Sequence, residues 1–185
     1  MVFFLITIQV EELKEQAKIL KAGERISLSG FIYTARDAAH KRIVALMDAN
    51  QSLPFELQNS VIYYAGPTPA KEGLAVGSCG PTTSGRMDIF APRLLQAGLL
   101  GMIGKGERDE AVCAAICQHQ GIYLCAIGGA GALASKSIKT CEVIAFPELG
   151  CESVKRLYLQ DFPLIVAIDC QGGNLFKEGR EKYKI

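Results

Sequence analysis

The chain has 185 residues, 49% of them apolar, and a formal net charge of +1 at neutral pH. This length suits one well-buried domain and is short for two, so we expect a single domain over residues 1–185. The near-zero charge, without a basic stripe, gives no reason to expect nucleic acid or a membrane surface as a partner.

The chain begins with an apolar run, Val2–Ile8. The run is too short to span a bilayer, and it lacks the charged start and small-residue cleavage site of a secretory signal. We therefore expect a cytoplasmic protein in which this run forms a strand or an arm that packs on a partner.

Hydrophobic periodicity predicts alternating helices and strands along the rest of the chain. The expected helices are Glu11–Lys21, Arg36–Met47, Met87–Gln96 and Glu107–Gln120. The expected strands are Arg25–Thr34 with a bulge at Gly30, Val61–Ala65, Leu99–Ile103, Ile122–Ile127, Val143–Phe146 and Leu164–Ile168. The charged stretch Gln171–Ile185 is expected to fray or to touch a partner. This order predicts the α/β class, with a mixed or partly closed β core surrounded by helices.

Three segments each place a cation beside small residues. They are Thr34–His40 (TARDAAH), Gly80–Asp88 (GPTTSGRMD) and Gly104–Glu107 (GKGE). An arginine offers a planar fork that matches a carboxylate, and a lysine supplies a compact point charge. We therefore expect Arg36, Arg86 and Lys105 to converge on a ligand with two carboxylates; the alternative is that they are solvated cations in surface loops.

The seven cysteines are spaced irregularly, without a Cys-x-x-Cys pair, and the chain has only two histidines, His40 and His119. Zinc-ribbon and ferredoxin-type spacings are therefore absent. We expect mostly buried, reduced thiols in a reducing compartment and no metal site in this chain.

Five segments in the same order resemble the iron–sulfur-dependent class I fumarases, in their C-terminal domain or in the separate β subunit of two-subunit versions; L-tartrate dehydratase β subunits are similar. The segments are Thr34–Arg42, Gly66–Lys71, Gly80–Asp88, Gly101–Glu107 and Phe162–Asp169. The resemblance implies a swivelling β/β/α domain and a hydro-lyase that interconverts fumarate and (S)-malate. It also implies a [4Fe–4S] cluster held by the α subunit or N-terminal domain, activity only with that subunit, and an α2β2 assembly.

The resemblance also assigns roles to residues. Arg36, Arg86 and Lys105 match the carboxylate-binding positions, and Thr82 and His40 match positions linked to proton transfer. Thr82 and Thr83 are also expected to bind substrate from the loop Gly80–Asp88 (the substrate loop). Imidazole titrates near neutrality, which favours His40 as the base, whereas a threonine hydroxyl needs strong activation. Alternatively, His40 bonds Asp37 and orients Arg36, and the loop hydroxyls satisfy their own backbone.

Other functions stay open. Tartrate or mesaconate is an alternative substrate, although the loop Thr-Thr-Ser-Gly-Arg-Met-Asp is closer to fumarases. The pattern Gly129-x-Gly131-x-x-Ala134, with Glu148 further on, suits a nucleotide-binding module. A third possibility is a non-enzymatic, free-standing binding or regulatory subunit.

Overall fold

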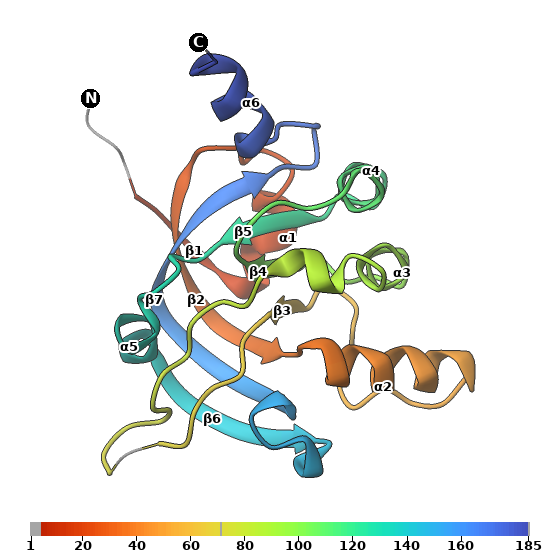
Figure 1. Cartoon of the computed structure of the whole chain (residues 1–185), viewed down its shortest axis with the longest axis vertical. Helices are drawn as coiled ribbons and strands as arrows, with labels where there is room; N and C mark the ends of the chain where they lie inside the picture. The colour runs from red at the N-terminus through yellow and green to blue at the C-terminus, as the bar shows by residue number, and fades with distance from the viewer. Residues whose placement is uncertain (1–4, 71, 185) are drawn as a thin grey trace.

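The computed structural model describes residues 5–70 and 72–184, which form a curled sheet with helices around it (Figure 1). The strands are β1 (Ile6–Gln9), β2 (Arg25–Thr34), β3 (Val61–Tyr63), β4 (Gly101–Gly104), β5 (Ile122–Cys125), β6 (Ile138–Ala145) and β7 (Val154–Ile168). The α-helices are α1 (Leu13–Gln16), α2 (Asp37–Asp48), α3 (Ala91–Gln96), α4 (Glu110–Gln118), α5 (Gly131–Ala134) and α6 (Leu175–Lys182). Short 3₁₀ turns are η1 (Val10–Glu12), η2 (Ser84–Met87), η3 (Ser135–Ser137) and η4 (Pro147–Glu152).

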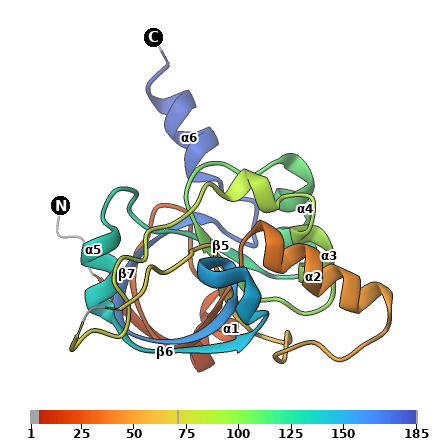
Figure 2. The ribbon, with the colours of Figure 1, turned by 60° about the horizontal axis from the view of Figure 1, so that its bottom comes forward.

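The sheet closes on itself. Its strand order is β1-β2-β3-β4-β5-β7-β6, and β2 also pairs with β7, so β2, β3, β4, β5 and β7 form a ring. Strands β1 to β5 pair in parallel, whereas β7 runs antiparallel to β2, β5 and β6. Figure 2 shows the strands curving round in this ring, with α2, α3 and α4 on its outer side. The predicted α/β class with a partly closed β core is confirmed.

The two faces of the strands bury two separate apolar cores. Neighbouring strand residues point to opposite faces, so Tyr63 joins one core and Tyr64 the other. The first core also holds Ile26 and Phe162, and the second packs the sheet against helix residues such as Ile43. Burying both faces explains why the parallel strands read as short, continuous apolar runs.

The predicted strand Arg25–Thr34 is confirmed to the residue as β2, and the predicted helix over Arg36–Met47 is confirmed as α2. The expected bulge is present, because the register of β2 against β7 shifts between Leu28 and Gly30. Gly30 has a φ of +125° and lies so close to Val10 that an added Cβ would be 2.9 Å from the valine Cβ. Only glycine meets both demands without strain.

Three predicted helices are shorter than expected. The predicted helix over Glu11–Lys21 is confirmed only in its first part, as η1 and α1, and the predicted helix over Met87–Gln96 is split into η2 and α3. The predicted helix over Glu107–Gln120 begins at Glu110 because the Asp109 side chain accepts the backbone N–H of Val112. Side-chain capping and turns therefore set these boundaries, which apolar periodicity does not detect.

The last two strands are longer than predicted. Only Leu164–Ile168 was expected of β7, which starts at Val154 and has 15 residues. Polar residues interrupt its apolar pattern, and Asp161 adopts a φ of +52° beside Ser29, whose Oγ accepts the Asp161 N–H at 2.9 Å.

At the C-terminus, the helix α6 forms instead of fraying, since the Asn174 side chain accepts the backbone N–H groups of Phe176 and Lys177. Across the described part of the chain, no helix has the length and apolarity that a bilayer crossing requires.

Candidate functional site

The three cation-bearing segments meet at the carboxyl ends of the parallel strands. Arg36 follows β2 and Lys105 follows β4. The Gly80–Asp88 segment lies against these strand ends, because Thr82 N–H donates to the Tyr64 carbonyl at 2.7 Å and Ser84 N–H donates to the Lys105 carbonyl at 2.9 Å. This edge of an open or closed parallel sheet is the usual place for a ligand site.

Arg36 is the N-cap of α2, with extended backbone, so its side chain lies at the start of the helix. Its Nη2 is 3.3 Å from Glu152 Oε1, and the other oxygen of Glu152 accepts the Ala38 N–H at 3.3 Å. The Arg36 Nε is buried and has no hydrogen-bond partner among the described residues. Glu152 thus orients Arg36, whose side chain is 21% exposed and whose Nη1 has no partner among the described residues.

Arg86 is held from the side by Asp37. Its Nε donates to Asp37 Oδ1 at 2.9 Å, and the Arg86 side chain is 53% exposed. Within the described residues the two terminal nitrogens of Arg86 have no partner. The other carboxylate oxygen of Asp37 is buried and also unpaired there. Asp37 therefore fixes the guanidinium and leaves its two-pronged end free for a carboxylate.

Lys105, Thr82 and Thr83 complete the cluster of predicted site residues. Lys105 and Thr83 are exposed and Thr82 is half-buried. No side chain or backbone group in the described part of the chain bonds the Lys105 ammonium or the Thr82 hydroxyl. These groups are thus available, which disfavours the alternative that the threonine hydroxyls satisfy their own backbone.

Gly104 lets the substrate loop approach β4 closely. An added Cβ there would lie 2.0 Å from Ser84 Oγ and 3.0 Å from Tyr64 Cδ2. Ser84 Oγ in turn accepts the Lys105 N–H at 3.1 Å. The close approach therefore joins the loop of Thr82 to the segment of Lys105.

We expect Gly104→Ala to lower the free energy of unfolding by about 1–3 kcal/mol, because the methyl group overpacks this contact. Urea denaturation measures the change. Gly179→Ala is the control, since an added Cβ at Gly179 in α6 meets nothing within 4 Å. Equal stability of Gly104→Ala and the unaltered chain would show that the loop yields without cost.

His40 lies beneath the site and not in it. The residue has 0% exposure, and its ring packs beside Phe90 and edge-on to Tyr64. Its Nδ1 is 2.9 Å from the Arg36 carbonyl and so donates to it, which leaves Nε2 as an acceptor without a partner among the described residues. Burial lowers the pKa of His40 to about 4. This placement argues against His40 as the base. The alternative prediction, in which His40 bonds Asp37, is also wrong, since His40 bonds the carbonyl of Arg36.

The buried imidazole predicts a pH-dependent stability. Its ordinary pKa is 6.5, so between pH 6.5 and about 4 the unfolded chain binds a proton that the folded chain does not. Stability is therefore complete above pH 6.5 and falls as the pH is lowered, by about 2 kcal/mol from this group at pH 5. In His40→Asn, which retains a donor for the Arg36 carbonyl, we expect this part of the loss to disappear.

Urea denaturation at about pH 7.5 and about pH 5 measures the effect. The control is His119→Asn, which removes the other histidine of the chain. The same acid destabilisation in His40→Asn and in the unaltered chain would contradict the burial argument.

Three residues of the site escaped the sequence analysis. Glu152 carried no signal, since it lies far along the chain from Arg36. Asp88 and Arg108 form a buried ion pair under the loop, with 2.6 Å between Asp88 Oδ1 and Arg108 Nε. Asp88 is the last residue of the loop Gly80–Asp88, and Arg108 directly follows Gly104–Glu107. A charged residue at the end of each segment was the sequence signal that could have indicated this ion pair.

The nucleotide-binding alternative is wrong. The helix after the glycine pattern, α5, has only four residues, and the next strand, β6, pairs antiparallel with β7. A dinucleotide fold instead needs a long helix that leads to a parallel strand. Glu148, expected near a ribose, forms a surface ion pair with Arg42 at 3.2 Å.

The seven cysteines are free thiols, but the expectation that most of them are buried is wrong. Only Cys79 is buried, Cys117 and Cys151 are exposed, and the other four are partly buried. Burial raises the pKa of the Cys79 thiol to about 12. Among the described residues no three His, Cys, Asp or Glu side chains are grouped so that they hold a metal ion. The residues present therefore do not fit an iron–sulfur cluster.

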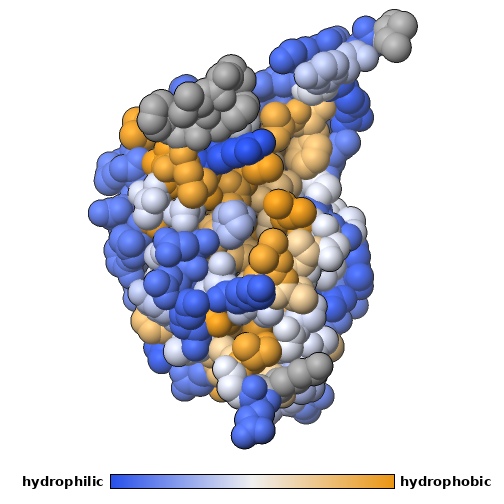
Figure 3. Space-filling model, turned by 90° about the vertical axis from the view of Figure 1, so that its left-hand side faces the viewer, coloured by the Kyte–Doolittle hydropathy of each residue, from blue (hydrophilic) through white to orange (hydrophobic). Residues whose placement is uncertain are grey.

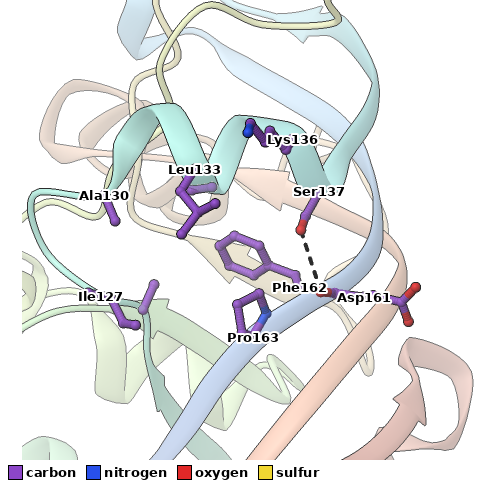
Figure 4. Close-up of a pocket in the computed structure, with 10 residues that line it drawn as sticks. Ile127, Ala130, Leu133, Lys136, Ser137, Asp161, Phe162 and Pro163 are labelled. Carbon is purple, nitrogen blue, oxygen red and sulfur yellow. Dashed lines mark hydrogen bonds between the residues drawn. The ribbon is translucent and has the colours of Figure 1, made fainter.

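One face of the molecule carries a patch of apolar residues (Figure 3). It includes a pocket of about 230 Å³ between α5, η3 and β7, where Leu133 and Phe162 point toward one another (Figure 4). A second pocket beside it is lined by Leu5, Ile127 and Pro163. Neither pocket is lined by a predicted site residue. The predicted partner contact through Val2–Ile8 stays a prediction, and Val2 to Phe4 lie outside the described residues.

Comparison with known proteins points to one family. The family model described as Fumarase C-terminus matches residues 4–179. The chain is 40% identical over 171 residues to the aerobic class I fumarate hydratase of Escherichia coli K12, covering 91% of this chain and 31% of that protein. It is also 40% identical over 172 residues to fumarate hydratase 2 of Leishmania major, covering 91% of this chain and 30% of that protein.

A further relative has nearly the same length as this chain. A Methanocaldococcus jannaschii protein, provisionally named L(+)-tartrate dehydratase subunit beta, is 38% identical over 175 residues, with 91% of this chain and 90% of that protein covered. By contrast, the chain spans about a third of the length of the fumarate hydratases that it matches.

Proposed function

Because this chain belongs to the Fumarase C-terminus family, we propose that it is the β subunit of a hydro-lyase that interconverts fumarate and (S)-malate. One observation carries this proposal. The segments that carry Arg36, Arg86 and Lys105 meet at the carboxyl ends of parallel strands, and each cation leaves nitrogen donors without partners among the described residues. A C4-dicarboxylate supplies the two anionic ends that such a cluster of cations needs.

The two arginines divide the binding task. Asp37 holds Arg86 through Nε, so the terminal nitrogens of Arg86 bind one substrate carboxylate in a forked geometry. Glu152 holds the Nη2 of Arg36, so the remaining terminal nitrogen, Nη1, which has no partner among the described residues, binds the substrate alongside Lys105. Loss of the C3 proton from malate places negative charge on the neighbouring carboxylate, and preorganised cations stabilise that charge.

Thr82 is the proposed proton-transfer residue. Its backbone is fixed by the hydrogen bond to the Tyr64 carbonyl, while its hydroxyl has no partner in the described part of the chain. Neighbouring cations favour the deprotonated hydroxyl, which is the activation that a threonine base needs. Thr83 binds substrate beside it, and His40 supports Arg36 from below through the backbone carbonyl.

A partner completes the enzyme in this proposal. The described residues of this chain do not form a cluster site, so we assign the [4Fe–4S] cluster to a separate α subunit in an α2β2 assembly. When bound there, the cluster supplies a Lewis acid for the departing hydroxyl. The free thiols support a reducing, cytoplasmic location.

A tartrate dehydratase is the second candidate, and mesaconate is a third substrate of the same chemical class. The relative that matches this chain over 90% of its own length carries the tartrate name. One hydroxyl or methyl group changes recognition only weakly in many pockets, so the charge pattern of the site does not separate these substrates.

Anaerobic co-expression with the chain's α-type partner tests the proposal. The assembled protein is assayed with malate, tartrate and mesaconate in parallel. Absorbance follows fumarate formed from malate, oxaloacetate formed from tartrate and the loss of mesaconate. We expect malate turnover by the assembled pair and none by this chain alone. A well-formed, cluster-loaded pair that turns over none of the three diacids would overturn the proposed function.

A further inference from the structure

We propose that Arg108 is a positioning residue that holds the three cation-bearing segments in register, an inference that rests on the proposed function. The Arg108 side chain has 0% exposure, so it does not reach a ligand itself. Its contacts nevertheless lead to each segment that carries a predicted substrate-binding residue.

The first contact reaches the segment of Arg86. Arg108 Nε donates to Asp88 Oδ1 at 2.6 Å, and Asp88 Oδ2 accepts the Asp109 N–H at 2.7 Å. Asp88 lies two residues after Arg86, directly beyond η2. The buried carboxylate therefore ties this end of the substrate loop to the segment that follows Lys105.

The second contact reaches Lys105. The Arg108 guanidinium carbon is 5.0 Å from the centroid of the Tyr123 ring. The Tyr123 hydroxyl is 2.9 Å from Ser84 Oγ and donates to the Gly106 carbonyl at 2.8 Å. Ser84 Oγ also accepts the Lys105 N–H. The position of the Tyr123 ring thus sets the positions of both Ser84 and Lys105.

The third contact reaches Arg36. The guanidinium carbon of Arg108 is 5.3 Å from the centroid of the Tyr64 ring, and Arg108 Nη2 is 3.5 Å from the Tyr64 hydroxyl. Tyr64 packs edge-on to His40 with 5.4 Å between ring centroids, and His40 donates to the Arg36 carbonyl. Arg108 is therefore in contact with two tyrosines, one of which leads to Lys105 and the other to Arg36.

A need for stability alone does not explain this charge. The attraction within a buried ion pair often does not exceed the free energy lost when both charges leave water. Well-packed apolar residues of similar size often give an equally stable protein. An apolar pair, however, does not reproduce the planar, directional contacts to a carboxylate and to two ring faces. Orientation of the surrounding segments is what the arginine adds.

This distinction provides the test, a double variant that combines Arg108→Met with Asp88→Leu. The matched control is Arg93→Met with Asp48→Leu, which replaces a surface ion pair of the same 2.6 Å length. Two readouts are taken. One is the KM for malate of the assembled enzyme, and the other is amide hydrogen exchange at Ser84 and Lys105.

We expect the double variant to fold, to raise KM by about tenfold or more, and to speed exchange at both amides, because the cations lose their fixed positions. A merely structural role would reduce the active fraction and hence kcat, with KM unchanged. Wild-type KM and exchange in the folded variant would overturn the inference. If the double variant does not fold, Arg108→Lys, which keeps the charge without the planar fork, is measured with the same criteria.

If the proposed function is wrong, the measurements give a different result from the one expected if only the positioning role of Arg108 is wrong. In that case the unaltered assembled protein turns over no diacid, whereas amide exchange still reports on Arg108. Faster exchange at Ser84 and Lys105 would then support the positioning role for whatever ligand the site binds, and unchanged exchange would overturn it.

Discussion

Arg86→Gln in the assembled enzyme is expected to lower kcat/KM for malate by about 10² to 10³, since each hydrogen bond to a charged group contributes about 1.5–3 kcal/mol. Asp37 already occupies the Nε of Arg86, so the terminal nitrogens make the contacts that are lost. Glutamine retains length and polarity but neither the charge nor the fork. Most of the loss should appear as a raised KM, because the carboxylate is bound in both the ground state and the transition state.

The measurement is steady-state kinetics of the reconstituted pair. Arg93→Gln is the matched control, because Arg93 is 41% exposed and pairs with Asp48 as Arg86 pairs with Asp37. The control should retain wild-type kinetics. Unchanged kcat/KM in Arg86→Gln would mean that Arg86 is a solvated surface cation, the alternative that its sequence context left open.

Thr82→Val should lower kcat by about 10² to 10⁴, the range that a positioned acid or base contributes, with KM nearly unchanged. Valine has the shape of threonine without the hydroxyl. The Thr82 backbone N–H keeps its bond to the Tyr64 carbonyl, so the loop is retained. The variant thus isolates the chemical role of one oxygen atom.

Thr140→Val, at an exposed position of β6, is the control for the loss of a surface hydroxyl. A kcat within about twofold of wild type in Thr82→Val would remove Thr82 from proton transfer. The buried Asp37 oxygen, which has no partner among the described residues, would then be the next group to substitute.

Local sequence predicted the elements that local forces determine. The β2 strand and its bulge follow from apolar alternation and Gly30, and α2 follows from helical spacing. The first half of β7 could not be predicted in this way. Its Lys155 and Arg156 interrupt the apolar pattern, and its length comes from pairing with β2 and β6, which are distant in the sequence. That the chain is a single domain stays a prediction.

In the site, too, local sequence predicted some residues, whereas tertiary contacts determine others. The sequence context identified the three cations Arg36, Arg86 and Lys105, because each adjoins small residues in a loop. The structure brings their segments together. The groups that orient these cations could not be identified from the sequence, because Glu152 is brought to Arg36 by tertiary packing alone. His40 was attractive as a base on intrinsic chemistry, and only its burial between Phe90 and Tyr64 argues otherwise.

The central claim is that Arg36 and Arg86 bind the carboxylates of the substrate. Arginine modification by phenylglyoxal in the assembled protein, quantified by peptide mass spectrometry with and without malate, tests it most directly. Arg42 and Arg93, whose side chains are 54% and 41% exposed, provide internal references in the same sample. We predict that malate slows modification of Arg36 and Arg86 and leaves both references unchanged. Equal protection of all four arginines, or of none, would contradict the claim.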